Sequence, residues 1–125
     1  MTPKPDMAGR ADIERFLWAF YEKAFKDDLI GRFFTEVVPL NLDTHIPVIT
    51  DFWESVVFNN RGYRKNVMEI HRHIHHLSPI KKEHLGRWVE IFTQTADEFF
   101  EGEKNSLMKQ RAQSIAMLME LKLGE

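Results

Sequence analysis

Histidine is concentrated in one short stretch of this 125-residue chain. Five of the six histidines lie between Met68 and Trp88, namely His71, His73, His75, His76 and His84. Imidazole is the commonest metal ligand among protein side chains, because near pH 7 it is neutral and has a free nitrogen lone pair. The density therefore indicates a metal site, and a solvated histidine-rich turn without any ligand is the alternative interpretation.

The spacing of these histidines is compatible with a small metal site. His71 and His75 lie four residues apart, so a helix would carry both on one face. Arg72 follows His71 at the position where zinc metalloprotease helices carry Glu, and no nearby pair of carboxylates completes a ligand set. A helical zinc or nickel site built from His71, His75 and His84 is one hypothesis, and a ligand-free helical interaction module is another.

Composition excludes several other classes of site. The chain has no cysteine, which rules out disulfides, thiolate–zinc sites and cysteine-held iron–sulfur clusters. It has neither a Gly-rich phosphate loop nor a Gly-x-Ser-x-Gly elbow. A formal net charge of −2 provides no basic field for nucleic acid. No apolar run approaches the roughly 18 residues of a membrane helix, so we expect a cytoplasmic protein without nucleic-acid or membrane partners.

Apolar residues recur at helical spacing along most of the chain, and nothing alternates with period two for long enough to be a strand. The fold class expected is all-α. We predict long helices over 12–28, 41–60, 81–100 and 104–122, a short helix over 67–77 and a tight helical turn within 29–40. Residues 1–11 should form a flexible N-terminus, and residues 12–125 one domain.

Local signals refine these helices. Asp12 is the expected N-cap of the first helix, and Asp43 or Thr44 that of the second. Gly86, inside a long helix, costs up to about 1 kcal/mol against Ala, which is tolerable where something approaches closely. From spacing alone, Tyr21 is best interpreted as a core aromatic, and His45 as a surface or capping histidine beside an apolar stripe.

Taken together, these features resemble the truncated haemoglobins, most closely their third group. The chain also lacks a Gly-Gly pair, as the third group does. The resemblance spans about Ile13 to Leu118 and rests on Phe20-Tyr21, Leu29, Phe33-Phe34, His45, Phe52-Trp53, Asn66 to Met68, His71, Pro79 to His84, Arg87-Trp88, Ile91-Phe92, Arg111-Ala112 and Ile115-Ala116.

The resemblance implies a truncated globin fold, with helices in a two-over-two sandwich around haem b. His71 would be the proximal iron ligand. A few extra residues around His75 to Leu77 make His75 the runner-up and His73 a further rival. Tyr21, Trp88 and His45 would lie on the distal side, where their N–H or O–H groups could bond a ligand.

The remaining roles that the resemblance implies concern the walls of the haem pocket and its ligands. The walls would comprise Phe20, Phe33, Phe34, Ile49, Phe52, Trp53, Phe92 and Ile115. The propionates would pair with Arg64, Lys65, Arg72 and His75. Such a protein would bind O2, CO, NO, cyanide or peroxide. It could consume nitric oxide or act as a peroxidase, with a reductase as a possible partner.

Overall fold

The computed structural model describes residues 4–58 and 67–123. Within these ranges the regular structure is helical throughout, so the predicted all-α class is confirmed. The elements are α1 (Arg10–Lys26), the π-helix η1 (Phe33–Val37), α2 (Leu42–Val57), α3 (Val67–Leu77), α4 (Lys82–Phe99) and α5 (Glu103–Leu123). None of the described helices is both long and apolar enough to cross a membrane.

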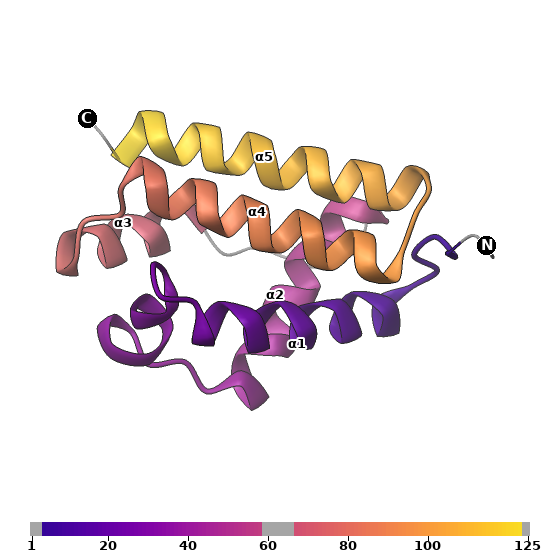
Figure 1. The fold of residues 1–125 in the computed structure, drawn as a ribbon, viewed down its shortest axis with the longest axis horizontal. Coiled ribbons are helices and arrows are strands. Elements are labelled where there is room, and N and C mark those ends of the chain that lie inside the picture. Colours follow the sequence, from indigo (N-terminus) through magenta and orange to yellow (C-terminus); the bar gives the residue numbers. More distant parts are fainter. Residues whose placement is uncertain (1–3, 59–66, 124–125) are drawn as a thin grey trace.

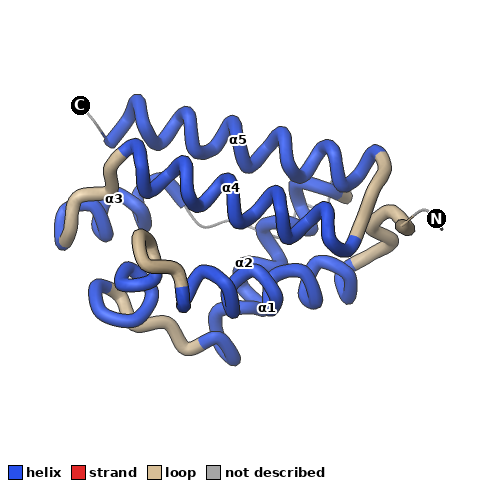
Figure 2. Tube along the Cα trace, in the orientation of Figure 1, coloured by secondary structure: helices blue, strands red, loops and turns tan. Residues whose placement is uncertain are grey.

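The four long helices form two stacked pairs (Figures 1 and 2). Helices α4 and α5 lie side by side and run antiparallel in one layer, and α1 packs on α2 in the other. The layers join where α1 meets α4 and where α2 meets α5. Helix α3 packs on α5 and on η1 at one end of the sandwich. The predicted two-over-two arrangement is therefore confirmed.

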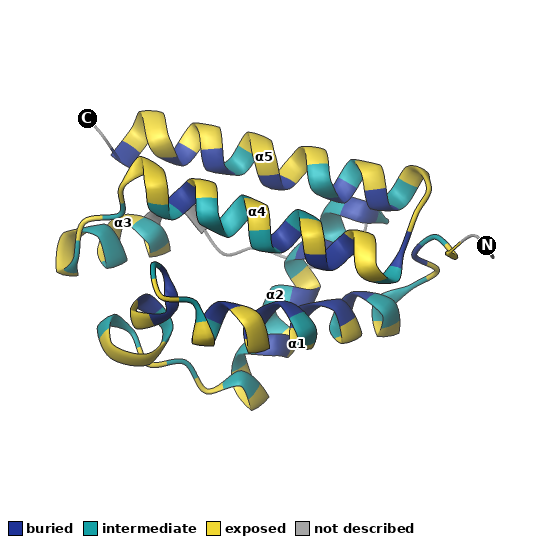
Figure 3. Cartoon of the chain, viewed as in Figure 1, coloured by how far each residue is buried: buried dark blue, intermediate teal, exposed yellow. Residues whose placement is uncertain are grey.

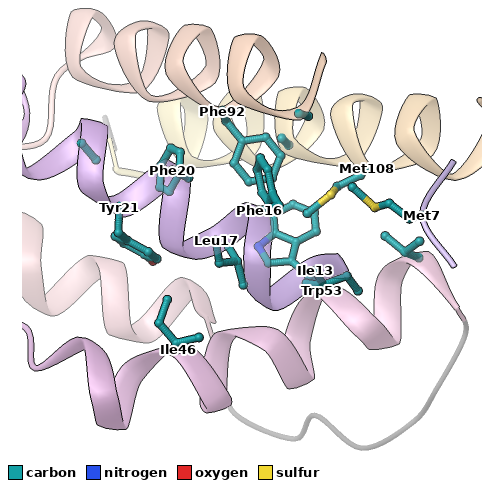
Figure 4. Close-up of a cluster of buried hydrophobic side chains, with 14 of the residues drawn as sticks. Met7, Ile13, Phe16, Leu17, Phe20, Tyr21, Ile46, Trp53, Phe92 and Met108 are labelled. Atoms are coloured by element: carbon teal, nitrogen blue, oxygen red, sulfur yellow. The ribbon is translucent and has the colours of Figure 1, made fainter. Parts of the chain in front are cut away.

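Aromatic side chains from both layers meet in the core (Figure 4). Phe16 of α1 packs edge-on against Phe92 of α4, with ring centroids 4.8 Å apart. Trp53 of α2 lies 4.9 Å from the same Phe92 ring. Buried surfaces of α1, α4 and α5 accordingly face inward, and exposed residues cover the outer sides (Figure 3). Burial of large rings fixes how the two layers sit on each other.

The first helix begins two residues earlier than predicted, and its predicted N-cap is wrong. Gly9 precedes the first helical residue, Arg10, and Gly9 makes no side-chain cap. Asp12 lies within the first turn, where its carboxylate accepts a hydrogen bond from the backbone N–H of Ala8 at 2.7 Å. An acidic residue in a first turn also suits the helix dipole, so Asp12 still favours this start.

The N-cap of α2 is Asn41, and neither Asp43 nor Thr44 fills that position. The Asn41 side-chain oxygen accepts a hydrogen bond from the backbone N–H of Asp43 at 3.0 Å. Asn is among the best N-cap residues because its short side chain reaches an N–H that the helix leaves unpaired. The helix consequently starts at Leu42, which puts His45 in its first turns.

Residues 4–9 pack against the turn between α4 and α5. The Asp6 carboxylate accepts hydrogen bonds from the backbone N–H groups of Lys104 and Asn105 at 2.8 and 2.9 Å. Met7 beside it is 4% exposed. Asp6 thereby caps α5 from a distant part of the sequence. The proposed division into residues 1–11 and 12–125 remains a prediction.

Two glycines have different environments. A Cβ added at Gly31 would lie 2.6 Å from the carbonyl oxygen of Phe25, so this position requires the close approach that only glycine permits. A Cβ at Gly86 would meet nothing within 4 Å. No close approach of the described residues therefore accounts for the glycine at position 86.

Candidate ligand-binding pocket

A cavity of about 670 Å³ lies between the helices. That volume is within the range of roughly 300–1,000 Å³ typical of small-molecule and cofactor sites. Its walls come from all six described helices and from residues 38–41, which lead into α2. Most lining side chains are apolar or aromatic, and a few polar ones converge among them.

Most of the residues expected at a haem pocket line this one cavity. They are Phe20, Tyr21, Phe33, Phe34, His45, Ile49, Phe52, Trp53, His71, Trp88, Phe92 and Ile115. Arg72 and His75 are not among the lining residues. Arg64 and Lys65 lie outside the described residues.

Tyr21 and His45 form a polar pair in the pocket wall. The Tyr21 hydroxyl lies 2.9 Å from Nε2 of His45, and the ring nitrogen that carries the proton decides which group donates. Tyr21 is 7% exposed. Burial raises its pKa far above the usual value, so the hydroxyl stays protonated and able to donate. The interpretation of His45 as a surface or capping histidine is therefore wrong.

The π-helix η1 brings two phenylalanines to the same cavity. The backbone N–H of Val38 donates to the carbonyl of Phe33 at 3.1 Å, an i to i+5 step. This turn is wider than an α-turn, so consecutive side chains diverge less around the axis, and Phe33 and Phe34 both line the pocket. The predicted tight turn is thus wrong in its geometry. Single π-turns frequently mark functional sites.

Helix α3 begins and ends where the sequence predicts, and it separates the rival histidines. His71 lines the pocket. His75 is engaged elsewhere, because its Nδ1 accepts a hydrogen bond from the backbone N–H of Ile80 at 2.9 Å. His73 is exposed. Of these three side chains, only His71 is placed to hold a group inside the cavity.

A zinc or nickel site is not supported by the described part of the chain. Within residues 4–58 and 67–123, no three His, Asp or Glu side chains lie close enough to hold a metal ion. His84 is instead part of the start of α4, where its Nδ1 accepts a hydrogen bond from the backbone N–H of Lys81 at 2.8 Å. Burial lowers the pKa of His84, which favours the neutral ring that this hydrogen bond requires.

Trp88 lies between the core and the cavity. Its ring meets Phe20 edge-on at 6.3 Å and lies 5.1 Å from Phe92. The neighbouring Arg87 donates to the Asp27 carboxylate at 2.7 Å, which ties α4 to the end of α1. This ion pair helps to set the rotation of α4 that turns Trp88 toward the pocket.

Comparisons with known proteins agree with this architecture. No family model matches the chain. It is 25% identical over 116 residues to the group 3 truncated hemoglobin Ctb of Campylobacter jejuni, a match that covers 90% of this chain and 89% of that protein. The crystal structure of a group III truncated hemoglobin from the same organism superposes with a TM-score of 0.82 at 24% identity, covering 96% of this chain and 94% of that one. The chain has the truncated globin fold. The resemblance to group III truncated haemoglobins is confirmed.

Part of the pocket wall was not predicted from the sequence. Lining residues that were not predicted to belong to the pocket include Val38, Leu40, Thr44, Ile74 and Ile80. Ile74 could have been found, since it lies three residues after His71 on the same helical face. Val38 and Leu40 precede α2 in a segment without helical periodicity, so no pattern identified the direction of their side chains.

Proposed function

We propose that this truncated globin binds haem b in the cavity and binds O2 and related diatomic ligands at the haem iron. The supporting observation is one largely apolar cavity that has His71 on its α3 wall and the Tyr21–His45 pair on its α1–α2 wall. A flat apolar ring system fits aromatic walls, and imidazole is one of the side chains that hold haem iron in proteins. The residues present therefore suit haem.

In this proposal His71 holds the iron through one imidazole nitrogen. The other ring nitrogen then requires an acceptor that fixes the tautomer. When bound, haem supplies an iron with an open coordination position for a diatomic ligand. The hydrogen bonds and apolar contacts of the site come from side chains of the protein.

On the distal side, Tyr21 would be the donor to a diatomic ligand. When His45 carries its proton on Nε2, the imidazole donates to the phenolic oxygen at 2.9 Å. This would leave the phenolic O–H able to donate to the ligand, and such a hydrogen bond is worth about 1–2 kcal/mol. Trp88 supplies an indole N–H, which can only donate.

Several donors around one ligand should slow the release of O2. Slow release suits chemistry or sensing better than oxygen delivery. The site also suits CO, NO, cyanide and peroxide as ligands. Nitric-oxide consumption or a peroxidase-like reaction follows from the same donors, because they can polarise a bound ligand. Nitric-oxide consumption would need one electron per cycle, which a reductase could supply, whereas a peroxidase-like reaction would take its electrons from a reducing substrate.

The test is an absorption spectrum of the purified protein, oxidised and then reduced under CO. We expect a haem spectrum that shifts with CO. We expect His71→Ala to lose the proximal ligand and His75→Ala, its matched control on α3, to keep the wild-type spectrum. An unchanged spectrum in His71→Ala would remove that residue from the iron.

Two other outcomes would replace the proposal. Stoichiometric zinc in a colourless protein would support a metal site that uses the histidines. A colourless protein whose unfolding midpoint is the same with and without added haem would support the ligand-free interaction module, because a ligand that binds the native state raises apparent stability.

A further inference from the structure

Three exposed cations lie beside one edge of the pocket. They are Arg32 at the start of η1 and Lys81 and Lys82 at the start of α4, and together they are named the basic rim here. The guanidinium of Arg32 donates to the hydroxyl of Ser78 at 2.6 Å, which joins η1 to the turn between α3 and α4. Segments 46 residues apart in sequence thus contribute to one surface.

The basic rim contrasts with the charge of the whole chain, which is −2. No acidic residue occurs from Ile70 to Lys82. Arg32 and Lys81 also lie close to one common side chain, His84. Burial lowers the pKa of His84, the neighbouring Glu83 opposes that shift, and the charges of Arg32 and Lys81 lower the pKa further. Two cations from different elements therefore act on a single imidazole.

Only one layer of side chains separates the basic rim from the cavity. The Arg32 guanidinium lies 4.7 Å from the centroid of the Phe33 ring, and the His84 ring meets the same phenylalanine edge-on at 5.0 Å. Phe33 and His84 both line the pocket. A macromolecule held on the basic rim would thus lie close to whatever the pocket contains.

We propose that the basic rim docks an acidic electron-transfer protein that carries a one-electron centre near its surface. The inference rests on the proposed function, since the electron would leave the reduced donor and convert ferric haem iron to ferrous. Charge complementarity of this kind raises association rates by about 10- to 1,000-fold, and salt suppresses it. Nucleic acid is also negatively charged, but its long phosphate backbone binds to extended positive surfaces. A protein of net charge −2 has only this local group of cations to bind it.

The experiment reverses the charge of the basic rim. Lys81→Glu with Lys82→Glu is compared with Lys104→Glu and Arg111→Glu, a control pair on α5 that makes the same change in net charge away from the basic rim. An acidic flavodoxin, reduced to its hydroquinone, reduces each ferric haem-loaded protein in a stopped-flow instrument at low and high salt. Photoreduced free lumiflavin, which is small and neutral, reduces the same proteins as a control. Its rate would change only if the substitutions altered the haem or its access.

At low salt we expect the flavodoxin rate to fall about tenfold or more in the rim variant and to stay near wild type in the control pair. High salt should remove the difference, since charges beyond about 3 Å are screened at 1 M. Lumiflavin rates should be equal in all three proteins. Equal losses in both variants, or a parallel loss with lumiflavin, would overturn the inference.

Binding separates this inference from the proposed function. Titration of oxidised flavodoxin into the protein should show salt-sensitive binding that the rim variant loses and the control pair keeps. Wild-type protein that takes up no haem but still binds flavodoxin would end the haem proposal and leave the docking surface standing. Haem-loaded wild-type protein that binds no flavodoxin at low salt, or whose basic rim binds duplex DNA more tightly than flavodoxin, would end the docking proposal.

Discussion

Replacing Tyr21 by Phe removes one oxygen atom from the pocket wall and keeps the ring in place. That ring packs edge-on against Phe20 at 5.0 Å and against Phe34 at 5.7 Å, and both contacts survive the change. The hydrogen bond to His45 at 2.9 Å is lost. A net hydrogen bond is worth about 0.5–1.5 kcal/mol, so the free energy of unfolding should fall by no more than that.

The effect on a bound ligand should be larger than the effect on folding. In the haem-loaded protein the phenolic O–H would contribute about 1–2 kcal/mol to O2 binding. Because 1.4 kcal/mol is about tenfold in a rate, O2 should dissociate roughly 5- to 30-fold faster from Tyr21→Phe. Stopped-flow displacement of O2 by CO measures this rate. Trp18→Phe, which changes an exposed ring on α1, is the control and should match wild type.

An unchanged O2 dissociation rate in Tyr21→Phe would refute the distal role of this hydroxyl. A slower rate would also refute it, because it would mean that the hydroxyl opposes the ligand. A change of similar size in Trp18→Phe would show that the assay reports general loosening of α1. Urea unfolding of both variants separates that possibility from a local effect.

Two further predictions concern stability. The Asp27 carboxylate is partly buried, which raises its pKa, but hydrogen bonds from Ile30, Arg87 and Leu29 outweigh burial and leave the pKa below the usual value of about 3.9. The stabilisation of the fold by the ionised Asp27 carboxylate is therefore complete above about pH 4. It is lost as the pH falls through the lowered pKa of the folded state. Asp27→Asn should cost about 1–3 kcal/mol at pH 7, and its thermal midpoint should fall less than that of wild type between pH 5 and pH 2. Gly31→Ala should lower the free energy of unfolding by about 1–3 kcal/mol, because the added Cβ meets backbone. Gly86→Ala should raise it by up to about 1 kcal/mol, because the added Cβ meets nothing and alanine favours the helix. Urea unfolding measures both changes, and changes of the same sign would contradict the reasoning.

Helical periodicity predicted the long helices well, because it depends on which residues face the core. Helix α4 (Lys82–Phe99) and helix α5 (Glu103–Leu123) each lie within one residue of the predicted bounds. The ends of α1 and α2 were less predictable. Asn41 was overlooked as a cap because two other capping residue types, Asp43 and Thr44, follow it, and only the backbone conformation at Asn41 decides among the three.

The contact between Tyr21 and His45 could not be predicted from the spacing of residues in the sequence. A helical pattern shows which side of a helix a residue occupies, but it does not identify the element across from it. These two residues lie 24 positions apart on different helices, and their contact depends on how α1 crosses α2. The family resemblance supplied both residues as distal groups, and the structure supplies the hydrogen bond between them.

The hydrophobic core and the pocket wall share residues in this fold, so one side chain can pack in the core and also line the cavity. Phe20 is 1% exposed and packs on Phe92 at 5.5 Å, yet it also lines the cavity. Phe16 is 0% exposed and is not a lining residue. Phe20→Leu and Phe16→Leu should each cost about 1–3 kcal/mol of stability, since both leave space in a packed core.

Only Phe20→Leu should also speed the loss of haem, because it alone opens the pocket wall. Urea unfolding measures the first effect, and transfer of haem to excess apomyoglobin measures the second. Equal rates of haem loss in the two variants would mean that haem retention follows global stability. In that case Phe20 would contribute only to the hydrophobic core, and other apolar residues of the cavity would have to hold the haem.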